Sequence, residues 1–202
     1  MAASLVWALP VTFAGPGDAR LTELENLTEA QLVEACLAGR SGAFDLVVER
    51  HRRTVYQLCY RFVGNHEDAS DLSQDVFLRA YRGLRSFRGG SSLSTWLYRI
   101  GVNVCLNRVT AKRPIMEDID ARPHVDTVHE PQDERVLREE RAVRVRTAIA
   151  KLPPKQRATL VLRMYQELSH EEIAGILDSS VGAVKANFFH AMGNLKKILS
   201  EA

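Results

Sequence analysis

The sequence predicts an all-α fold of two helical domains joined by a flexible acidic linker, and three observations support this prediction. Apolar residues recur at helical spacing on both sides of the chain's middle, and no stretch alternates as a strand would. The net charge is +5 over residues 26–113, −6 over residues 114–140 and +5 over residues 141–202. The acidic segment contains Pro114, Pro123 and Pro131 but few large apolar residues, so it has little with which to form a core. The predicted domains are therefore residues 26–113 and 140–202, with residues 114–139 as the linker.

The composition excludes several classes of protein. Of the 202 residues, 46% are hydrophobic and 26% are charged, which is typical of a soluble globular chain. No run approaches the roughly 20 apolar residues of a membrane-spanning helix, so no membrane insertion is expected. The three cysteines lie far apart without a CxxC pair, which excludes a disulfide framework or a zinc ribbon. A reducing cytoplasm is the simplest location.

The first 25 residues are predicted to be a flexible extension. The stretch Ala2–Ala14 is apolar enough to suggest a secretory signal. However, no Lys or Arg precedes it and Pro10 interrupts it, whereas signal peptides normally begin with a basic leader. The extension is therefore favoured over the signal peptide.

The first domain is predicted to contain four helices. Thr28 and Gln31 form a capping box at the start of a short helix through Ala38. A longer helix follows and ends before Gly64. The next helix, Glu67–Leu84, has the apolar stripe Ala69, Leu72, Val76, Ala80 and Leu84. The last helix begins at Leu93 and runs to about Val109, with the stripe Leu93, Leu97, Ile100 and Val104.

The opposite face of this last helix is the first candidate site. Trp96, Arg99, Asn103 and Asn107 fall within roughly 80° of arc at about 100° per residue. An aromatic ring or a guanidinium can stack on a base, and amides can bind base edges. Basic residues that could bind phosphates lie nearby: Arg88, Arg108, Lys112 and Arg113. The alternative is a buried Trp with a polar surface beyond it.

The second domain shows a helix-turn-helix pattern. After Pro153 and Pro154, a helix is predicted over residues 155–165 with Leu160, Val161 and Met164 as its apolar residues. Ser169 and Glu172 then cap a short helix, and residues 178–180 form a turn. The second helix, Gly182–Leu199, has the stripe Val184, Phe188, Ala191 and Leu195. It exposes Lys185 and Phe189, which suits a helix that enters the DNA major groove. The alternative is an ordinary helical hairpin.

Motifs in both domains together resemble one known family. In the first domain these are Asp68–Phe77, Phe87–Gly89 and Ser94–Ile100 with Asn103. In the second they are Leu152–Pro153, Leu168–Ala174 and Val181–Lys185. In this order the motifs resemble regions 2.2 to 2.4 and region 4 of the extracytoplasmic-function (ECF) sigma factors of bacterial RNA polymerase. Each motif alone is weak, but the ordered set is specific.

The resemblance implies a sigma factor that directs core RNA polymerase to promoters and melts the DNA. Its partners would be core RNA polymerase, promoter DNA and an anti-sigma factor. Residues 26–113 would be the region 2 domain and residues 140–202 the region 4 domain. The residues implied to bind core polymerase are Asp68, Asp71, Gln74 and Asp75. Those implied to bind the minus-ten element are Arg88, Trp96, Arg99, Asn103, Asn107 and Arg108. Those implied to bind the minus-thirty-five element are Ser180, Gly182, Lys185, Ala186, Phe189 and His190.

The sequence departs from the family pattern in the helix-turn-helix. Asp178 stands where the turn commonly has Gly, and the second helix has Ala183, Ala186, Asn187 and His190 where the family usually has other polar residues. These differences leave the promoter sequence undefined.

The sequence fits two other classes of function less well. A helix-turn-helix regulator that acts without polymerase would leave the acidic face of residues 68–75 and the face of residues 96–107 without a role. An enzyme is disfavoured because the chain has neither a Gly-rich phosphate loop nor an HExxH motif, and it shows no catalytic residue and no cofactor motif. A metal site in the linker, from His124, Asp126, His129 and Glu130, is disfavoured as well, because flexible acidic segments often contain such clusters without binding metal.

Overall fold

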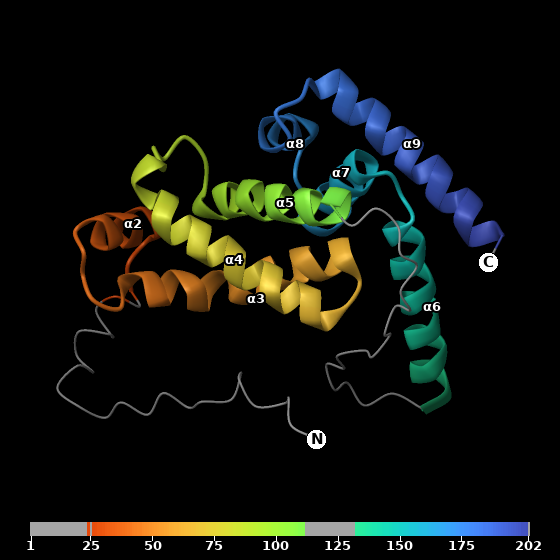
Figure 1. Cartoon of the computed structure of the whole chain (residues 1–202), viewed down its shortest axis with the longest axis horizontal. Helices are drawn as coiled ribbons and strands as arrows, with labels where there is room; N and C mark the ends of the chain where they lie inside the picture. The colour runs from red at the N-terminus through yellow and green to blue at the C-terminus, as the bar shows by residue number, and fades with distance from the viewer. Residues whose placement is uncertain (1–23, 25, 112–131, 202) are drawn as a thin grey trace. The chain divides into compact units, whose positions relative to one another are not determined.

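The computed structural model describes residue 24, residues 26–111 and residues 132–201, excluding the side chains of residues 132–139. Every regular element in these ranges is a helix, as predicted (Figure 1). The elements are α2 (Glu29–Leu37), α3 (Ala43–Val63), α4 (His66–Gly83), the 3-10 helix η1 (Leu84–Ser86), α5 (Leu93–Ala111), α6 (Gln132–Ala150), α7 (Pro154–Tyr165), α8 (His170–Ile176) and α9 (Val181–Ser200). The predicted N-terminal extension lies almost wholly outside the described residues. So do most of the predicted linker and all four residues of its possible metal site.

The chain forms two compact units, residues 1–48 and residues 49–202, and the boundary falls within α3. In the first unit, α2 begins at the predicted capping box. The Thr28 side chain accepts a hydrogen bond from the Gln31 backbone, and the Gln31 side chain accepts one from the Thr28 backbone. The helix is followed by Gly39 at φ 70°, a conformation that favours glycine because it has no Cβ. The sequence signals therefore predicted both ends of α2.

In the second unit, α4 and α5 pack against each other through the apolar stripes that the spacing predicts. All five stripe residues of α4 and η1 are buried: Ala69, Leu72, Val76, Ala80 and Leu84. On α5, Leu93, Leu97 and Val104 are buried as predicted, while Ile100 is only half-buried. Gly101 is buried beside them, and a Cβ added there would lie 2.9 Å from Leu58 Cδ2 of α3. This missing side chain lets α5 approach α3 closely.

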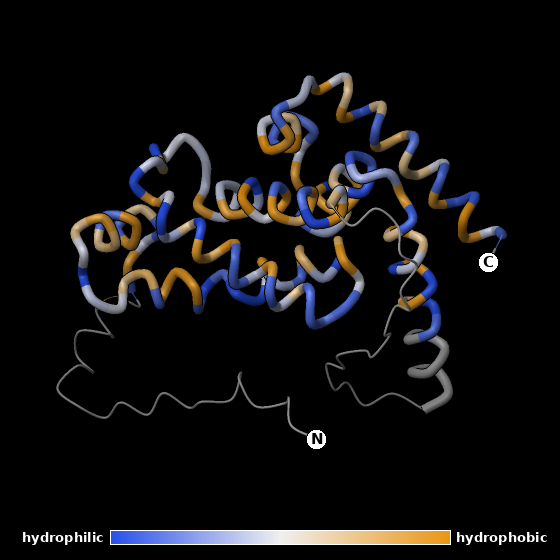
Figure 2. Tube along the Cα trace, in the orientation of Figure 1, coloured by the Kyte–Doolittle hydropathy of each residue, from blue (hydrophilic) through white to orange (hydrophobic). Residues whose placement is uncertain are grey.

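The second unit also contains α6 to α9, and α7, α8 and α9 contact one another. Figure 2 shows hydrophobic and hydrophilic residues alternating along α9, as expected for a helix that buries one face. Val184 and Ala191 of the predicted α9 stripe are buried, and Phe188 and Leu195 are half-buried. Met164, one of the apolar residues of the predicted helix, is exposed near the end of α7.

Helices on both sides of residues 112–131 lie together in this second unit. Helix α5 contacts α4 and also contacts α7 and α8. The face of α5 that carries the candidate site is therefore next to the helix-turn-helix. Among the described residues, no helix is both long and apolar enough to cross a membrane.

Candidate functional site

The four residues predicted to form one polar face all lie on α5. Arg99, Asn103 and Asn107 are exposed, and Trp96 is half-buried. Ser92 fixes the start of this helix, because its side chain accepts a hydrogen bond from Thr95 N at 3.1 Å and its carbonyl accepts one from Trp96 N at 3.1 Å. The face thus begins at a defined first turn and continues along the exposed side of the helix.

The ring of Trp96 packs against the loop that precedes α5. Its centroid lies 5.4 Å from that of Phe87 with the ring planes 52° apart, and a Cβ added at Gly83 would lie 3.7 Å from Trp96 Cζ2. Aromatic pairs favour such tilted arrangements. Part of the Trp96 side chain therefore packs against the loop, as expected for a buried Trp. The rest is open to solvent, as expected for a ring that stacks on a base. The loop residue Arg88 is exposed next to Phe87.

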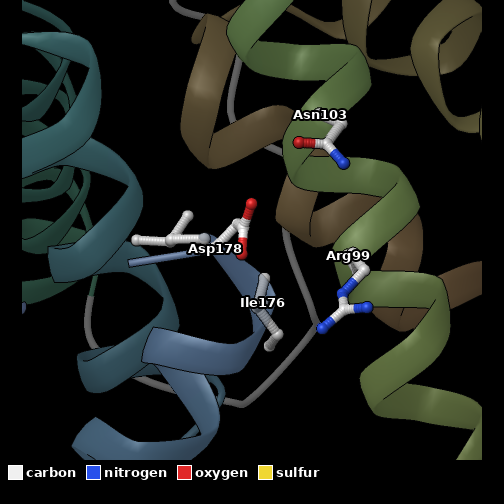
Figure 3. Close-up of a pocket in the computed structure, with 5 residues that line it drawn as sticks. Arg99, Asn103, Ile176 and Asp178 are labelled. Carbon is white, nitrogen blue, oxygen red and sulfur yellow. The ribbon is translucent and has the colours of Figure 1, made fainter. Parts of the chain in front are cut away.

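Arg99 and Asn103 line a pocket of about 320 Å³ between α5 and the helix-turn-helix. The other lining residues are Ile176, Leu177 and Asp178, which end α8 and begin the turn. Figure 3 shows Asp178 and Ile176 on one side of the pocket and Arg99 and Asn103 on the other. The Arg99 guanidinium donates a hydrogen bond to the Gly175 carbonyl of α8. The pocket thus joins two surfaces that the sequence analysis treated as separate.

Asp68 and Arg108 were predicted on different binding surfaces, but they form an ion pair with each other. The Asp68 side chain is only 15% exposed, and it also accepts a hydrogen bond from Asn65 Nδ2 at 3.0 Å. Asn65 in turn caps α4, because its Oδ1 accepts a hydrogen bond from Asp68 N at 2.8 Å. This pair connects the start of α4 to the end of α5.

The remaining residues predicted to bind polymerase follow the outer face of α4. Asp71 and Gln74 are exposed, and both carboxylate oxygens of Asp75 accept hydrogen bonds from Arg79 Nε at 3.0 Å. The same contact raises the pKa of Arg79. Leu78 and Tyr81, which the sequence analysis missed, are 55% and 66% exposed. Their helical spacing from Asp71 and Gln74 could have identified them, because it places all four residues on the same face.

The helix-turn-helix has well-defined ends. The Ser169 side chain accepts a hydrogen bond from Glu172 N at 3.1 Å, and Glu172 accepts one from Ser169 N at 2.8 Å. This contact lowers the pKa of Glu172. Asp178 has φ 47°, which explains why glycine suits this position of the turn. The Ser180 side chain caps α9 by accepting a hydrogen bond from Ala183 N at 3.2 Å.

All six residues predicted to bind the minus-thirty-five element are exposed in the turn or on the first three turns of α9: Ser180, Gly182, Lys185, Ala186, Phe189 and His190. Phe189 is 76% exposed, which is unusual for a large aromatic side chain. Its ring lies edge-on to that of His190, with centroids 5.8 Å apart. The part of the chain that the structure describes contains no group of three His, Cys, Asp or Glu side chains suited to a metal ion.

Two family descriptions match the chain in the order that the motifs predicted. Residues 47–115 match Sigma-70 region 2, and residues 142–195 match Sigma-70, region 4. The first match covers α4, η1, α5 and most of α3. The second covers the C-terminal part of α6, all of α7 and α8, and most of α9. The candidate surfaces on α4, α5 and α9 therefore all lie within matched regions.

Similar proteins give the same result. The chain is 36% identical over 180 residues to the RNA polymerase sigma-H factor of Pseudomonas aeruginosa, covering 85% of this chain and 93% of that protein. It is 38% identical over 177 residues to the ECF RNA polymerase sigma-E factor of Escherichia coli K12, covering 83% and 92%.

Solved structures support the fold. One is CnrH in complex with the cytosolic domain of CnrY, with a TM-score of 0.64, 24% identity and coverage of 86% of this chain and 97% of that one. Another is the sigma factor RpoE in complex with the anti-sigma factor NepR from Bartonella quintana, with a TM-score of 0.63, 21% identity and coverage of 79% and 98%. Both matched regions and the similarity over most of the chain confirm the predicted resemblance. The chain belongs to the extracytoplasmic-function sigma factors, which bind core RNA polymerase and direct it to promoter DNA.

Proposed function

We propose that this sigma factor binds its partners through three surfaces. The outer face of α4 binds core polymerase, the exposed face of α5 with the preceding loop binds the minus-ten element, and α9 binds the minus-thirty-five element. The observation that carries the proposal is the arrangement on α5, where a partly open indole, a guanidinium and two exposed amides follow one another along a single helix. These groups can stack on an unpaired base and bind its edge.

The α5 face has the chemistry to hold melted DNA. Taking a base out of the duplex costs a few kcal/mol, which stacking and edge hydrogen bonds in a binding site can offset. Trp96 supplies a ring that the Phe87 contact holds in place, and Asn103 supplies both a donor and an acceptor. Arg88 is exposed in the adjoining loop and is available for phosphates. Arg108 is less available for phosphates, because it already forms an ion pair with Asp68.

The outer face of α4 suits a protein partner. Asp71 and Gln74 lie beside the exposed apolar side chains of Leu78 and Tyr81, and such a mixture is typical of interfaces that bury an aromatic anchor within a polar rim. By family resemblance the partner is the clamp of the polymerase's largest subunit. Asp68 contributes mainly to the fold, because Arg108 and Asn65 already engage it.

The proposal extends to regulation and location. The solved relatives RpoE and CnrH are each in a complex, RpoE with the anti-sigma factor NepR and CnrH with the cytosolic domain of CnrY. An anti-sigma partner for this chain is the corresponding inference. A chain that acts with RNA polymerase works in the cytoplasm. The sigma factor family is not an enzyme family, and no catalytic step is assigned to any residue.

The experiment is run-off transcription with core polymerase on a genomic template library, with and without this chain. Transcripts that require both proteins support the proposal and define the promoter motif. Promoter binding that is equally tight without core polymerase would instead identify a polymerase-independent regulator.

On promoters found in this way, Asn103→Ala is expected to reduce permanganate reactivity of the melted region while core binding is retained. The reduction should depend on the minus-ten sequence, because an amide binds base edges rather than phosphates. Asn107→Ala, one turn further along the same face, is the matched variant, and a smaller effect there would place the base near Asn103. An equal loss on every promoter would show that Asn103 acts through the fold.

A further inference from the structure

Three arginines meet where α3, α6 and α7 come together, and each is buried or half-buried. Arg157 of α7 is the buried one, and its guanidinium donates hydrogen bonds to the carbonyls of Phe62 and Ala150. Phe62 follows Arg61 of α3, and Ala150 lies one turn after Arg146 of α6. The carbonyls at the end of a helix favour a cation, so the charge of Arg157 is already compensated. Among the described residues, no carbonyl compensates Arg61 or Arg146 in this way.

Aromatic rings fix the positions of these other two guanidinium groups. The guanidinium carbon of Arg61 lies 3.5 Å from the centroid of the Tyr165 ring, and that of Arg146 lies 5.6 Å from the centroid of the Tyr60 ring. Tyr60 in turn stacks on His66, with the ring centroids 4.6 Å apart. A guanidinium group can stack on a ring and still donate hydrogen bonds from its nitrogens. The rings therefore position both side chains without using all of their donors.

The two cations lie close together without a neutralising carboxylate. Burial lowers the pKa of Arg61, the contact with Tyr165 raises it, and the charge of Arg146 lowers it again. The two guanidinium groups are therefore near enough to repel each other. Within the part of the chain that the structure describes, neither arginine forms an ion pair with Asp or Glu. An anion bound to both would replace this repulsion with two attractions.

Three polar atoms at the same place lack hydrogen-bond partners. They are Nε of Arg61, Nη2 of Arg146 and the hydroxyl of Tyr60, which the protein covers but which no described residue pairs. Buried polar groups in folded proteins are almost always paired with protein, water or an ion. Guanidinium nitrogens can only donate, and a phenol hydroxyl can donate too. A group rich in acceptors and in negative charge suits all three.

A phosphate group fits these donors better than a carboxylate does. It carries about −1.5 to −2 charges at pH 7 as a monoester, which matches two arginines. Its oxygens also accept two parallel hydrogen bonds from one guanidinium group. Because Arg61 and Arg146 are half-buried, they favour a small ligand. An extended nucleic-acid backbone is expected instead at exposed arginines such as Arg141 and Arg144 of α6.

We propose that Arg61 and Arg146, with the hydroxyl of Tyr60, form a binding site for the phosphate group of a small molecule. The site lies apart from the outer face of α4, the exposed face of α5 and α9, and it does not rest on the proposed function. A phosphate bound there neutralises both guanidinium groups and links α3 to α6. Since it binds the folded chain, it stabilises that chain by mass action.

The test titrates inorganic phosphate into the full-length chain without polymerase or DNA, with sodium chloride at equal ionic strength as the reference. Phosphate should raise the melting temperature in a saturable way, whereas chloride should not. Isothermal titration calorimetry on the folded protein gives the dissociation constant directly.

Arg61→Met and Arg146→Met should each raise the dissociation constant for phosphate by roughly tenfold or more, because each removes hydrogen bonds to a charged group. Arg144→Met is the matched control, since it removes the same charge from an exposed position of α6 and should leave the constant unchanged. Circular dichroism shows whether each variant is folded. If Arg61→Met does not fold without its Tyr165 contact, Arg146→Met alone decides the result.

Adenosine monophosphate is the second probe, and it separates two sources of the phosphate group. Binding roughly tenfold tighter than that of inorganic phosphate would identify a nucleotide, because the Tyr165 ring is 36% exposed and can stack on a base. Equal or weaker binding would identify free phosphate. The site itself is overturned if phosphate stabilises the chain no more than chloride does. It is also overturned if Arg144→Met weakens binding as much as Arg146→Met, because the anion would then respond only to total charge.

Discussion

Gly101 and Gly193 show how the surroundings of a residue determine the effect of one added methyl group. A Cβ at Gly101 would lie 2.9 Å from Leu58 Cδ2, and Leu58 is fully buried, so its side chain has little room to move. A Cβ at Gly193 on α9 would meet nothing within 4 Å. Both positions gain about 1 kcal/mol of helix propensity from alanine. Only Gly101 also incurs an overpacking cost of about 1–3 kcal/mol.

Gly101→Ala should therefore lower the free energy of unfolding by up to about 2 kcal/mol, whereas Gly193→Ala should raise it by about 0.5–1 kcal/mol. Thermal or urea unfolding of the two variants against the parent protein checks both signs. An increase in stability for Gly101→Ala would mean that α5 and α3 separate easily and that the close approach is not required.

Lys185 and Phe189 lie one turn apart on α9, and their contacts with DNA should differ in kind. Lys185→Ala should weaken promoter binding by the holoenzyme and reduce the salt slope by about one if the lysine meets a phosphate. Phe189→Ala should leave the salt slope unchanged and relax the preference at one thymine by about 1 kcal/mol, because a methyl contact carries no charge.

Salt titrations of promoter binding measure both variants. Phe189 is 76% exposed, so its truncation should not lower the melting temperature. A sharp fall in melting temperature would show that Phe189 packs against a part of the chain that the described residues do not include.

At the scale of an element, the capping box of α8 links its stability to pH. Hydrogen bonds from Ser169 lower the pKa of Glu172, so the box stabilises the fold above about pH 4.3, the ordinary pKa of glutamate. That contribution is lost as the pH falls through the lowered pKa. Because Glu172 is exposed, solvent screening keeps its own contribution small.

Ser169→Ala should cost about 1 kcal/mol, or roughly 2–4 °C in melting temperature, at neutral pH. Glu172→Gln retains an acceptor for Ser169 N, so it should change stability little at pH 7 and should flatten the pH dependence below about pH 4.3. Melting curves from pH 3 to pH 7 test both. If the melting temperature of Glu172→Gln still falls with pH as in the parent protein, the pH dependence comes from other carboxylates.

Helix α7 shows what the sequence could and could not predict about an element. Its apolar spacing correctly identified the buried face, because Leu160 and Val161 are buried. Met164, the third apolar residue predicted for this helix, is 55% exposed, and the spacing gave no reason to bury Arg157. Periodicity defines the direction of a face but not which of its turns another helix covers. Arg157 can be buried because its guanidinium donates hydrogen bonds to the carbonyl of Phe62, which is distant in sequence, and to the nearby carbonyl of Leu152.

The same distinction holds for the candidate site. The residues of the α5 face could be predicted because they lie within one helix, where a fixed rotation per residue relates them. The Arg99 contact with Gly175 and the Arg108 contact with Asp68 could not, since each joins residues from different helices. Such contacts depend on tertiary packing, and they change the interpretation of two residues assigned to DNA binding.

At the scale of the whole molecule, the net charge of +2 hides an uneven distribution that suits two kinds of partner. The outer face of α4 presents Asp71 and Asp75 with exposed Leu78 and Tyr81, whereas α9 presents Lys185 without an acidic residue in its first turn. Opposite charges across an interface increase the association rate and fix the orientation. The α4 face is therefore expected to bind a basic protein surface, and α9 is expected to bind DNA.

Reversing Asp71 and Asp75 to Lys should weaken core binding by about 1–3 kcal/mol without unfolding the protein. Both side chains lie on the outer face of α4, and the Asp75 pair with Arg79 is exposed, so its loss costs little stability. The affinity for core polymerase should be measured by pull-down titration, with circular dichroism to show that the helices remain.

Glu140→Lys, an exposed reversal on α6, is the control and should leave the affinity unchanged. Because salt screens exposed charges, the difference between the two variants should shrink as the ionic strength rises. Unchanged affinity for the double reversal at low salt would move the polymerase contact away from α4, and an equal loss for Glu140→Lys would show that total charge rather than this face determines binding.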